Sequence, residues 1–459
     1  MAEQHPSEPA SEPPSVLWFR RDLRLGDHAA LMTAASHGPV TALFVLDDML
    51  LASSGGPRTA YLFRTLRALD ADLRAHGGAL TVRHGTPQDV VPALVREIGA
   101  AAVHVSADFG PYGARRDERV AAALGEVPLV PTGSPYAVAP GRVLKADGTP
   151  YKVFTPFYRA WSEHGWRRPA DSDPAKVTWL VVDGDAIPDD PAIDAELPEA
   201  GEAAALETWK AFQANGLRHY AKIRNRPDLD QTSRMSPHLK WGTIHPRTML
   251  VDLEGGNDAY RRQICWRDFY GQVLHHWPSS AHDYFKPDMK RMRYDGGKRA
   301  DEVFETWARG ETGFPIVDAG MRQLLAEGWM HNRVRMIVAS FLVKDLHLEW
   351  TRGARHFMDH LIDGDLANNQ HGWQWTAGTG TDAAPYFRVF NPVSQGEKFD
   401  PTGDYVRRWV PQLRGIPGAA VHQPWTQDEP PADYPPPMVD HKVERLEALD
   451  RLKAISRET

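Results

Sequence analysis

Residues 15–31, SVLWFRRDLRLGDHAAL, open with a short apolar run and then become strongly polar. Runs of the same kind, rich in β-branched residues, recur at 40–48, 81–85 and 101–109. Between the second and third runs, residues 58–76 carry leucine every three or four positions, the spacing of one helix face. Strands that alternate with helices predict a doubly wound parallel sheet, and so an α/β fold for the first part of the chain.

The carboxyl ends of the predicted strands mark a candidate binding site. Ligands of open parallel sheets bind beyond these ends, where the sequence places Arg20–Leu25, Asp47, Asp48 and residues 107–116. The glycine-rich fingerprint of dinucleotide-binding folds does not follow the first strand. The sequence therefore argues against a standard NAD site at this edge.

Length and composition bound the rest of the chain. With 459 residues, 42% hydrophobic and 25% charged, we expect two or three packed units large enough to bury a sizeable cofactor. Cys265 is the only cysteine, which excludes an intrachain disulfide and a multi-thiolate zinc or iron–sulfur site. The chain has no secretory signal pattern and no run of about 18 apolar residues, so we expect a cytoplasmic protein without a membrane span.

The sequence pattern changes beyond residue 165. Residues 165–202 are rich in Pro, Asp and Ala and predict a long connector. Strand signals then fade, and amphipathic stretches predict a mainly helical second domain, with helices at 203–215, 259–277, 316–327, 330–350, 353–362 and 440–456.

The net charge of −7 conceals an uneven distribution. Residues 171–202 hold ten acidic side chains and one base, Lys176, whereas residues 218–247 hold seven lysines and arginines against two aspartates. A basic face that binds a polyanion is compatible with this distribution, and so is an ordinary mixture of solvated charges.

Residues 219–236, HYAKIRNRPDLDQTSRMS, combine an aromatic ring, basic side chains and a Thr-Ser-x-x-Ser cluster. Hydroxyls and backbone amides at a helix start suit a phosphate or pyrophosphate, because the first amides of a helix lack partners and its dipole favours an anion. The alternative interpretation is an ordinary helix cap.

Residues 263–277, QICWRDFYGQVLHHW, place Trp266, Arg267 and Tyr270 within about one turn of a helix. An arginine beside an exposed ring can hold a phosphate while the ring stacks on a base. An amphipathic packing helix whose arginine reaches past the apolar surface explains the same pattern.

Two further segments gather polar side chains. A predicted helix places Asn332, Arg335 and Met336 on one face and directs Arg333 elsewhere. Residues 363–375 contain two aspartates spaced by one residue, two asparagines and two tryptophans. The aspartates suit a metal ion, or hydrogen bonds to ribose-like hydroxyls, or a salt bridge.

Eight motifs, in order, resemble the photolyase/cryptochrome family over about residues 15–450. They are WFRRDLRLGDHAAL, YKVFTPFYRAW, TSRMSPHLKWG, CWRDFY, ETGFPIVDAGMRQL, GWMHNRVRM, IDGDLANNQHGWQW and GTDAAPYFRVFNP. The chain is most similar to class I photolyases, which repair cyclobutane pyrimidine dimers in DNA. The resemblance implies a disordered tail (1–14), a Rossmann-like α/β antenna domain (15–134), a connector (135–202) and an all-α FAD-binding catalytic domain (203–459).

The resemblance also implies a folded FAD inside the helical domain, active as FADH−. The cofactor contacts that it implies are Tyr220, Thr232, Ser233, Arg234, Met235, Ser236, Arg267, Asn332, Arg335, Asp363, Asp365 and Asn369. Asn369 would face flavin N5, where a neutral amide can hydrogen-bond in several redox states without forcing protonation. Plant cryptochromes carry an Asp at the matching position, and animal cryptochromes carry a Cys. The Asn of this chain therefore resembles the repair enzymes.

The implied substrate is UV-damaged DNA with the pyrimidine dimer flipped into the cavity. Its implied contacts are Arg224, Gln263, Trp266, Asn332, Arg333, Met336, Trp375 and Arg388, with the two tryptophans stacked on the pyrimidines and the arginines on flanking phosphates. In relatives, excited reduced flavin donates an electron to the dimer, the ring splits and the electron returns, so the reaction needs light and no general base.

Two other activities compete with dimer repair. Photolyases that repair (6-4) photoproducts carry two histidines at the positions that match Asn332 and Met336. This chain therefore resembles them poorly. Blue-light cryptochromes typically carry a long C-terminal extension, and none follows the last predicted helix here. We therefore expect a deoxyribodipyrimidine photo-lyase, with a cryptochrome-type photoreceptor as the alternative.

The chain departs from the family pattern at two catalytic positions. Dimer-repairing relatives usually carry a Glu where Gln263 stands, and a Gln hydrogen-bonds but donates a proton less readily. Trp373 and Trp350 match the inner and middle members of the tryptophan chain that relays electrons to oxidised flavin, but Gly297 lies near the place of the outer member. Tyr294 is the nearest aromatic residue in sequence, and Trp329 and Trp307 offer other routes.

The loop DFGPYGARRDERV, residues 108–120, resembles that of relatives whose first domain binds a deazaflavin antenna. The resemblance implies 8-hydroxy-5-deazaflavin, with Asp108 and Arg20–Leu25 as contacts, and an empty pocket is the alternative. The protein is expected to be a monomer.

Overall fold

The computed structural model describes residues 12–253, 256–381 and 388–457. Most of the predicted tail, 1–14, and six residues of the last family motif, 382–387, lie outside the described residues.

A five-stranded parallel sheet forms the first part of the chain, which confirms the predicted α/β fold. Its strands are β1 (Ser15–Phe19), β2 (Val40–Leu46), β3 (Leu80–His84), β4 (Ala102–Val105) and β5 (Leu129–Pro131), in the order β3-β2-β1-β4-β5. The sequence predicts four strands and misses β5. This strand contains only three residues, too few to give a clear strand pattern.

Helices cover both faces of the sheet, because alternate residues of each strand point to opposite sides. Leu17 and Phe19 of β1 pack with α1 (Ala29–Ala35) and α3 (Gly56–Ala75), whereas Val16 and Trp18 pack with α4 (Pro87–Ile98) and α5 (Pro111–Leu124). The short helix α2 (Asp48–Ala52) follows β2. The sheet is thus doubly wound, as its topology requires.

The segment between the sheet and the helical region is ordered and packs back on the sheet. It contains helix α6 (Phe154–His164) and then runs past two strands, where the amide of Leu180 donates to Val40 O (2.9 Å) and that of Asp185 to Val82 O (2.8 Å). These backbone bonds satisfy polar groups of a stretch whose composition alone resembles a free linker.

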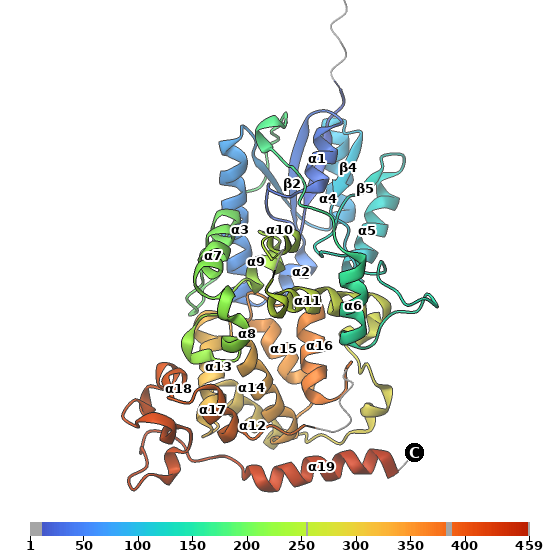
Figure 1. Ribbon diagram of the computed structural model, residues 1–459. Coiled ribbons are helices and arrows are strands. Elements are labelled where there is room, and N and C mark those ends of the chain that lie inside the picture. Colours follow the sequence, from blue (N-terminus) through green and yellow to red (C-terminus); the bar gives the residue numbers. More distant parts are fainter. Residues whose placement is uncertain (1–11, 254–255, 382–387, 458–459) are drawn as a thin grey trace, which may run out of the picture.

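The second part of the chain is helical, as the sequence predicts. Its helices are α7 (Glu202–Asn215), α8 (Tyr220–Ile223), α9 (Ser236–Trp241), α10 (Pro246–Val251), α11 (Asp258–His276), α12 (Lys298–Ala308), α13 (Pro315–Glu327), α14 (Asn332–Lys344), α15 (Trp350–His360), α16 (Leu366–Ala377), α17 (Pro392–Phe399), α18 (Asp404–Trp409) and α19 (His441–Arg457). In Figure 1 the sheet occupies one end of the molecule, and α19 runs across the opposite end.

The prediction of one helix over 330–350 is wrong, because α14 ends at Lys344. Leu346, Leu348 and Trp350 continue the apolar pattern and are buried, so periodicity gives no sign of the break. His347 adopts a left-handed conformation (φ 52°), which reverses the chain before α15 begins at Trp350.

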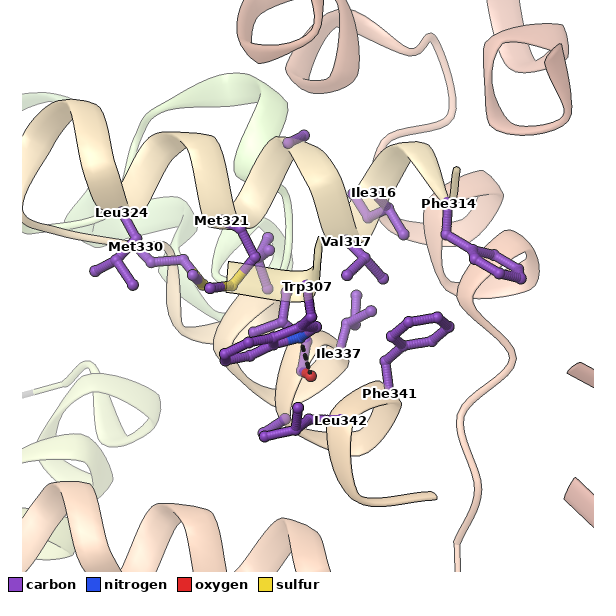
Figure 2. Packing of buried hydrophobic residues seen from close by; sticks show 14 of the residues in the cluster. Trp307, Phe314, Ile316, Val317, Met321, Leu324, Met330, Ile337, Phe341 and Leu342 are labelled. Carbon is purple, nitrogen blue, oxygen red and sulfur yellow. Dashed lines mark hydrogen bonds between the residues drawn. The ribbon is translucent and has the colours of Figure 1, made fainter. Parts of the chain in front are cut away.

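The core of the helical region forms where α13 and α14 meet. Figure 2 shows Trp307 between side chains of these helices, with Met321 and Ile337 close to its ring. The indole N–H of Trp307 donates to the backbone oxygen of Val338 (3.2 Å), so the buried ring has its polar atom satisfied.

Helices α15 and α16 approach closely because a glycine faces a tryptophan. A Cβ atom added at Gly353 of α15 would lie 2.1 Å from Cη2 of Trp373 on α16 and 2.6 Å from Cδ2 of Leu342. The absence of a side chain at Gly353 therefore fixes where the Trp373 ring lies.

We predict that Gly353→Ala lowers the free energy of unfolding by about 1–3 kcal/mol, because the new methyl group overlaps a packed ring. Urea unfolding of the apoprotein measures this change. Gly372→Ala is the matched control, since Gly372 also lies within a helix and an added Cβ meets no heavy atom within 4 Å in the described part of the chain. The control should be neutral or stabilising by up to about 1 kcal/mol, and an equal loss in both variants would contradict the packing argument.

Candidate functional site

One large cavity, of about 640 Å³, opens into the helical region. Every residue that the resemblance implies as a cofactor or DNA contact lines it, and so does Trp373. Trp350 is the exception among the predicted site residues, because it is fully buried behind the wall. The structure thus brings segments from residue 220 to residue 388 into one cavity, in the size range of small-molecule sites.

A tight loop before α9 supplies hydroxyl groups to the cavity. Arg234 has a positive φ of 50°, and its side chain is held by Asp230 (2.8 Å) and Glu327 (3.2 Å), which stabilises the turn. Ser233 accepts a hydrogen bond from Tyr260 (2.8 Å), whereas the buried hydroxyl of Thr232 has no partner among the residues that the structure describes.

At the end of that loop, Ser236 is the first residue of α9. Its hydroxyl accepts a hydrogen bond from the indole N–H of Trp329 (3.1 Å). Met235 is buried directly before it. The unpaired hydroxyl of Thr232 and the start of α9 therefore form a polar corner suited to an anionic group.

Helix α11 forms another wall. Gln263, Trp266 and Arg267 follow one another at helical spacing and all line the cavity. The guanidinium of Arg267 is buried, where it donates to the backbone oxygens of Pro135 (2.6 Å) and Leu239 (3.0 Å). These bonds fix a positive charge at the cavity wall.

The Trp266 ring lies parallel to that of Phe154, with centroids 3.7 Å apart. This stack holds the half-buried indole in place while it lines the cavity.

Helix α14 supplies Arg335, whose two terminal nitrogens bond both oxygens of Asp363 at 3.2 and 2.8 Å. Arg335 also donates to the backbone oxygen of Met330 (2.8 Å). The bidentate pair is geometrically specific, so it presents a fixed charge pattern to a ligand. Arg333 lines the cavity as well, which corrects the expectation that it points elsewhere, because the cavity wraps around this end of the helix.

Asp365 joins the cavity to the first part of the chain. One oxygen accepts from the backbone N–H of Asn368 (3.0 Å) and so caps α16, and the other accepts from Arg21 (2.6 Å). Burial alone raises the pKa of this carboxyl, but Arg21, Lys240 and Arg267 hold it well below its usual value. Asp365 is therefore an anion at every physiological pH.

The amide of Asn369 has a defined orientation. Gln370 donates to Ala281 O (2.5 Å), so its own oxygen accepts from the nitrogen of Asn369 (3.0 Å), which also donates to Ala354 O (2.9 Å). With its nitrogen occupied in this way, Asn369 offers its carbonyl oxygen to the cavity as a hydrogen-bond acceptor.

Burial divides the lining residues into a floor and a mouth. The floor contains Arg267, Asp363, Asp365, Asn369 and Trp373, which are all buried. The mouth contains the half-buried or exposed residues Arg224, Gln263, Trp266, Asn332, Arg333, Met336, Trp375 and Arg388. All the residues implied as DNA contacts are thus accessible. Several implied cofactor contacts, such as Thr232 and Ser236, are accessible as well, whereas no implied DNA contact lies among the buried residues of the floor.

Sequence reasoning missed several lining residues, of which Lys240, Tyr260 and Trp329 carry polar atoms. Burial, followed by the repulsion from Arg21, lowers the pKa of Lys240 to about 7. Lys240 lies within the motif TSRMSPHLKWG, so its helical spacing from Ser236 was an available signal.

The candidate site at the sheet is filled by its own ion pairs. Tyr112 donates to Asp47, Arg116 pairs with Asp108 (3.3 Å), and the buried Arg20 pairs with Asp117. In the segment Arg20–Leu25, Arg21 bonds Asp365 instead of facing this edge. The structure brings the predicted antenna residues together at the strand ends but directs part of the segment to the cavity.

The cavity residues fit a flavin dinucleotide on chemical grounds. The unpartnered Thr232 hydroxyl, the start of α9 and the buried Arg267 offer donors and positive charge for a pyrophosphate. No group of three or more His, Cys, Asp or Glu side chains that could hold a metal ion occurs among the described residues.

Helices long and apolar enough to cross a membrane are absent from the part of the chain that the structure describes.

Comparisons with known proteins agree with this site. Residues 15–178 match the family model described as DNA photolyase, and residues 260–454 match that of the FAD-binding domain of DNA photolyase. A deoxyribodipyrimidine photo-lyase of Streptomyces griseus is 42% identical over 461 residues, covering 95% of this chain and 99% of that protein.

Two solved structures are also similar over nearly their full length. A class III photolyase of Agrobacterium tumefaciens has a TM-score of 0.88 at 34% identity, covering 99% of this chain and 100% of that one. A cryptochrome of Synechocystis has a TM-score of 0.87 at 26% identity, covering 96% and 100%. With both family models and a full-length relative at this identity, the chain belongs to the DNA photolyase family, whose FAD-binding domain it contains.

Proposed function

We propose that this protein is a light-driven repair enzyme that splits cyclobutane pyrimidine dimers in UV-damaged DNA with reduced FAD. One observation carries the proposal: a single cavity has a buried polar floor that fits a flavin dinucleotide and an accessible mouth lined by tryptophans and arginines. The name of the Streptomyces griseus relative describes the same reaction. Donor and substrate would then lie within one enclosure, which short-range electron transfer requires.

The proposed FAD contacts are Tyr220, Thr232, Ser233, Arg234, Met235, Ser236, Arg267, Asn332, Arg335, Asp363, Asp365 and Asn369. Thr232 and Arg267 would bind the pyrophosphate, because they supply a free hydroxyl and a buried cation. The oxygen of Asn369 would accept from the flavin N5–H, since its nitrogen is already bonded to Ala354 and Gln370. When bound, reduced and excited by light, FAD supplies one electron to the dimer and recovers it after the ring has opened.

The proposed substrate contacts lie at the mouth. Trp266, fixed by its stack on Phe154, and Trp375 would stack on the flipped pyrimidines. Met336 would fill the space between them. Arg224, Arg333 and Arg388 would hold flanking phosphates, and Gln263 would hydrogen-bond a base edge. The protein thus binds and orients, and no residue is required as a general base.

The proposed organisation of the chain is a sheet domain (15–134), a connector (135–202) and a helical catalytic domain (203–459). It is supported by the end of β5 at Pro131 and the start of α7 at Glu202. A deazaflavin antenna beside Asp108 is also part of the proposal, and it rests on the resemblance of residues 108–120 to the loop of deazaflavin-binding relatives. A cytoplasmic monomer is proposed because the single cysteine, Cys265, is buried and unpaired and exposed apolar side chains are few in the described residues.

We predict that the dithionite-reduced, FAD-loaded protein restores thymine absorbance to oligonucleotides with cyclobutane dimers under blue light. The matched controls are the same mixture in the dark and an oligonucleotide with a (6-4) photoproduct, and neither should change. Light-dependent flavin chemistry without dimer repair would favour the photoreceptor alternative instead.

We predict that Trp375→Ala weakens binding of dimer-containing DNA by about 1–3 kcal/mol, because one base loses its stacking partner. Titration of a labelled oligonucleotide in the dark measures the change. Trp409 is half-buried outside the cavity, so Trp409→Ala is the control and should leave the affinity unchanged. An unaltered affinity in Trp375→Ala would assign that indole to packing.

We predict that Gln263→Glu raises the number of dimers repaired per absorbed photon, because a carboxyl group can donate a proton to the charged dimer. Affinity should stay within about 1 kcal/mol, since both side chains hydrogen-bond a base edge. The quantum yield under limiting light measures the effect. Gln412→Glu, outside the cavity, should alter neither quantity, and a lower yield in Gln263→Glu would contradict the assigned role.

A further inference from the structure

A row of aromatic side chains leads from the cavity floor to the protein surface. Trp373 lines the cavity, and its ring lies against the backbone of Gly353 on α15. Trp350 is the first residue of the same helix and is fully buried. The ring of the half-buried Tyr284 meets Trp350 edge to face, with centroids 5.9 Å apart and planes at 85°.

The indole N–H groups of the two tryptophans in this row lack a proton acceptor among the described residues. These groups, on Trp350 and Trp373, are also buried. A tryptophan that loses an electron in such a place keeps its proton and remains a strongly oxidising cation. It therefore tends to take an electron from a neighbouring ring.

Tyr284 differs because a base is bonded to its hydroxyl. The phenol donates to Oε1 of Glu349 (2.8 Å), and Glu349 is the residue directly before Trp350. Burial, aided by Tyr294 and Glu349, raises the pKa of the Tyr284 phenol. The phenol is thus neutral before it is oxidised, and its proton has an acceptor in place when it is.

Neighbouring aromatic residues are worse candidates for the surface end. Gly297 has no side chain. Tyr294, the nearest aromatic residue in sequence, contacts the Tyr284 hydroxyl, whereas the ring contact with Trp350 is made by Tyr284. Trp307 meets Trp373 at 6.2 Å, but it is fully buried and its N–H is bonded to Val338 (Figure 2). Trp329 donates to Ser236 at the cavity wall.

We propose that Tyr284 is the surface electron donor for reduction of oxidised FAD in the light, and that Glu349 accepts its proton. With oxidised FAD bound and excited by light, Trp373 would give it one electron, Trp350 would refill Trp373, and Tyr284 would refill Trp350. The O–H bond of Tyr284 breaks at the same time, the proton passes to Glu349, and a neutral tyrosyl radical remains. A thiol from solution reduces this radical, which the partial exposure of Tyr284 permits. Two such passes and one proton from solvent would give the two-electron-reduced FADH−.

The inference requires that the protein binds FAD. It depends on the proposed function in one respect, namely that reduced FAD is the form that repairs DNA. The transfer is coupled to a proton, so it differs chemically from a relay that ends on tryptophan. Tyr284 acts on the relay and touches no substrate, and Glu349 acts through Tyr284 as a positioning residue and proton acceptor.

The test is time-resolved absorption and electron paramagnetic resonance of the FAD-loaded, oxidised protein after a blue flash, without added reductant. Wild-type protein should give a neutral tyrosyl signal that becomes narrower when tyrosine is supplied ring-deuterated, and its formation should slow in D₂O. Tyr284→Phe should lose this signal and leave a short-lived tryptophan radical. In a second experiment, with thiol added under steady blue light, Tyr284→Phe should slow the reduction of FAD about tenfold or more. Glu349→Gln should weaken the tyrosyl signal and abolish the D₂O effect.

Tyr158→Phe is the matched control, because Tyr158 also donates to a carboxylate, that of Asp258, but lies on α6 in a different apolar cluster from this row. It should behave as wild type. Bound-FAD absorbance and the unfolding midpoint check that each variant is folded. A tyrosyl signal that persists in Tyr284→Phe, or a wild-type signal from tryptophan alone, would overturn the inference.

The repair assay on dithionite-reduced wild-type protein separates the two hypotheses, because it bypasses the relay. Repair without a tyrosyl signal would sink the relay and leave the proposed function intact. A tyrosyl signal without repair would support the relay and contradict the proposed function.

Discussion

The ion pair between the half-buried Arg21 and the buried Asp365 joins the two parts of the molecule at the cavity. Arg21 follows the first strand, whereas Asp365 caps α16, the helix that carries Asn369, Trp373 and Trp375. Removing one partner of such a pair leaves an unpaired buried charge, which is strongly destabilising. The orientation of α16, and therefore of the floor and part of the mouth, depends on a contact between residues 344 positions apart in the chain.

Pairing of polar groups explains how a helical core can hold so many charges. Asp363 is satisfied by Arg335, Arg267 by two backbone oxygens, and Asn369 by Gln370 and Ala354. Each partner removes the cost of burial and also fixes a direction in which the remaining atoms point. The donors and acceptors left over face the cavity, so the same bonds that stabilise the fold prepare the site for its cofactor.

Proton acceptors distinguish the aromatic residues that lead away from the cavity. Trp373 and Trp350 are enclosed by apolar packing and lack an acceptor among the described residues, whereas Tyr284 is bonded to Glu349. In the proposed relay, electrons move inward between these aromatic residues of one apolar cluster, and the positive charge settles only where a proton can leave. In the proposed relay, Tyr284 takes the place at the surface end for which Gly297 offers no side chain.

Local sequence patterns were sufficient for the alternation of strands and helices, for most helix positions and for the cavity residues carried by family motifs. The strands and helices depend on neighbours within about one or two turns, where periodicity is a direct signal. The cavity residues followed from the resemblance of the motifs to a known family and not from periodicity. The break after Lys344, the pairing of Arg21 with Asp365 and the contact of Tyr284 with Trp350 left no such signal. They arise when distant segments pack, because close packing and the pairing of buried charges select partners by position in space and not by distance along the chain.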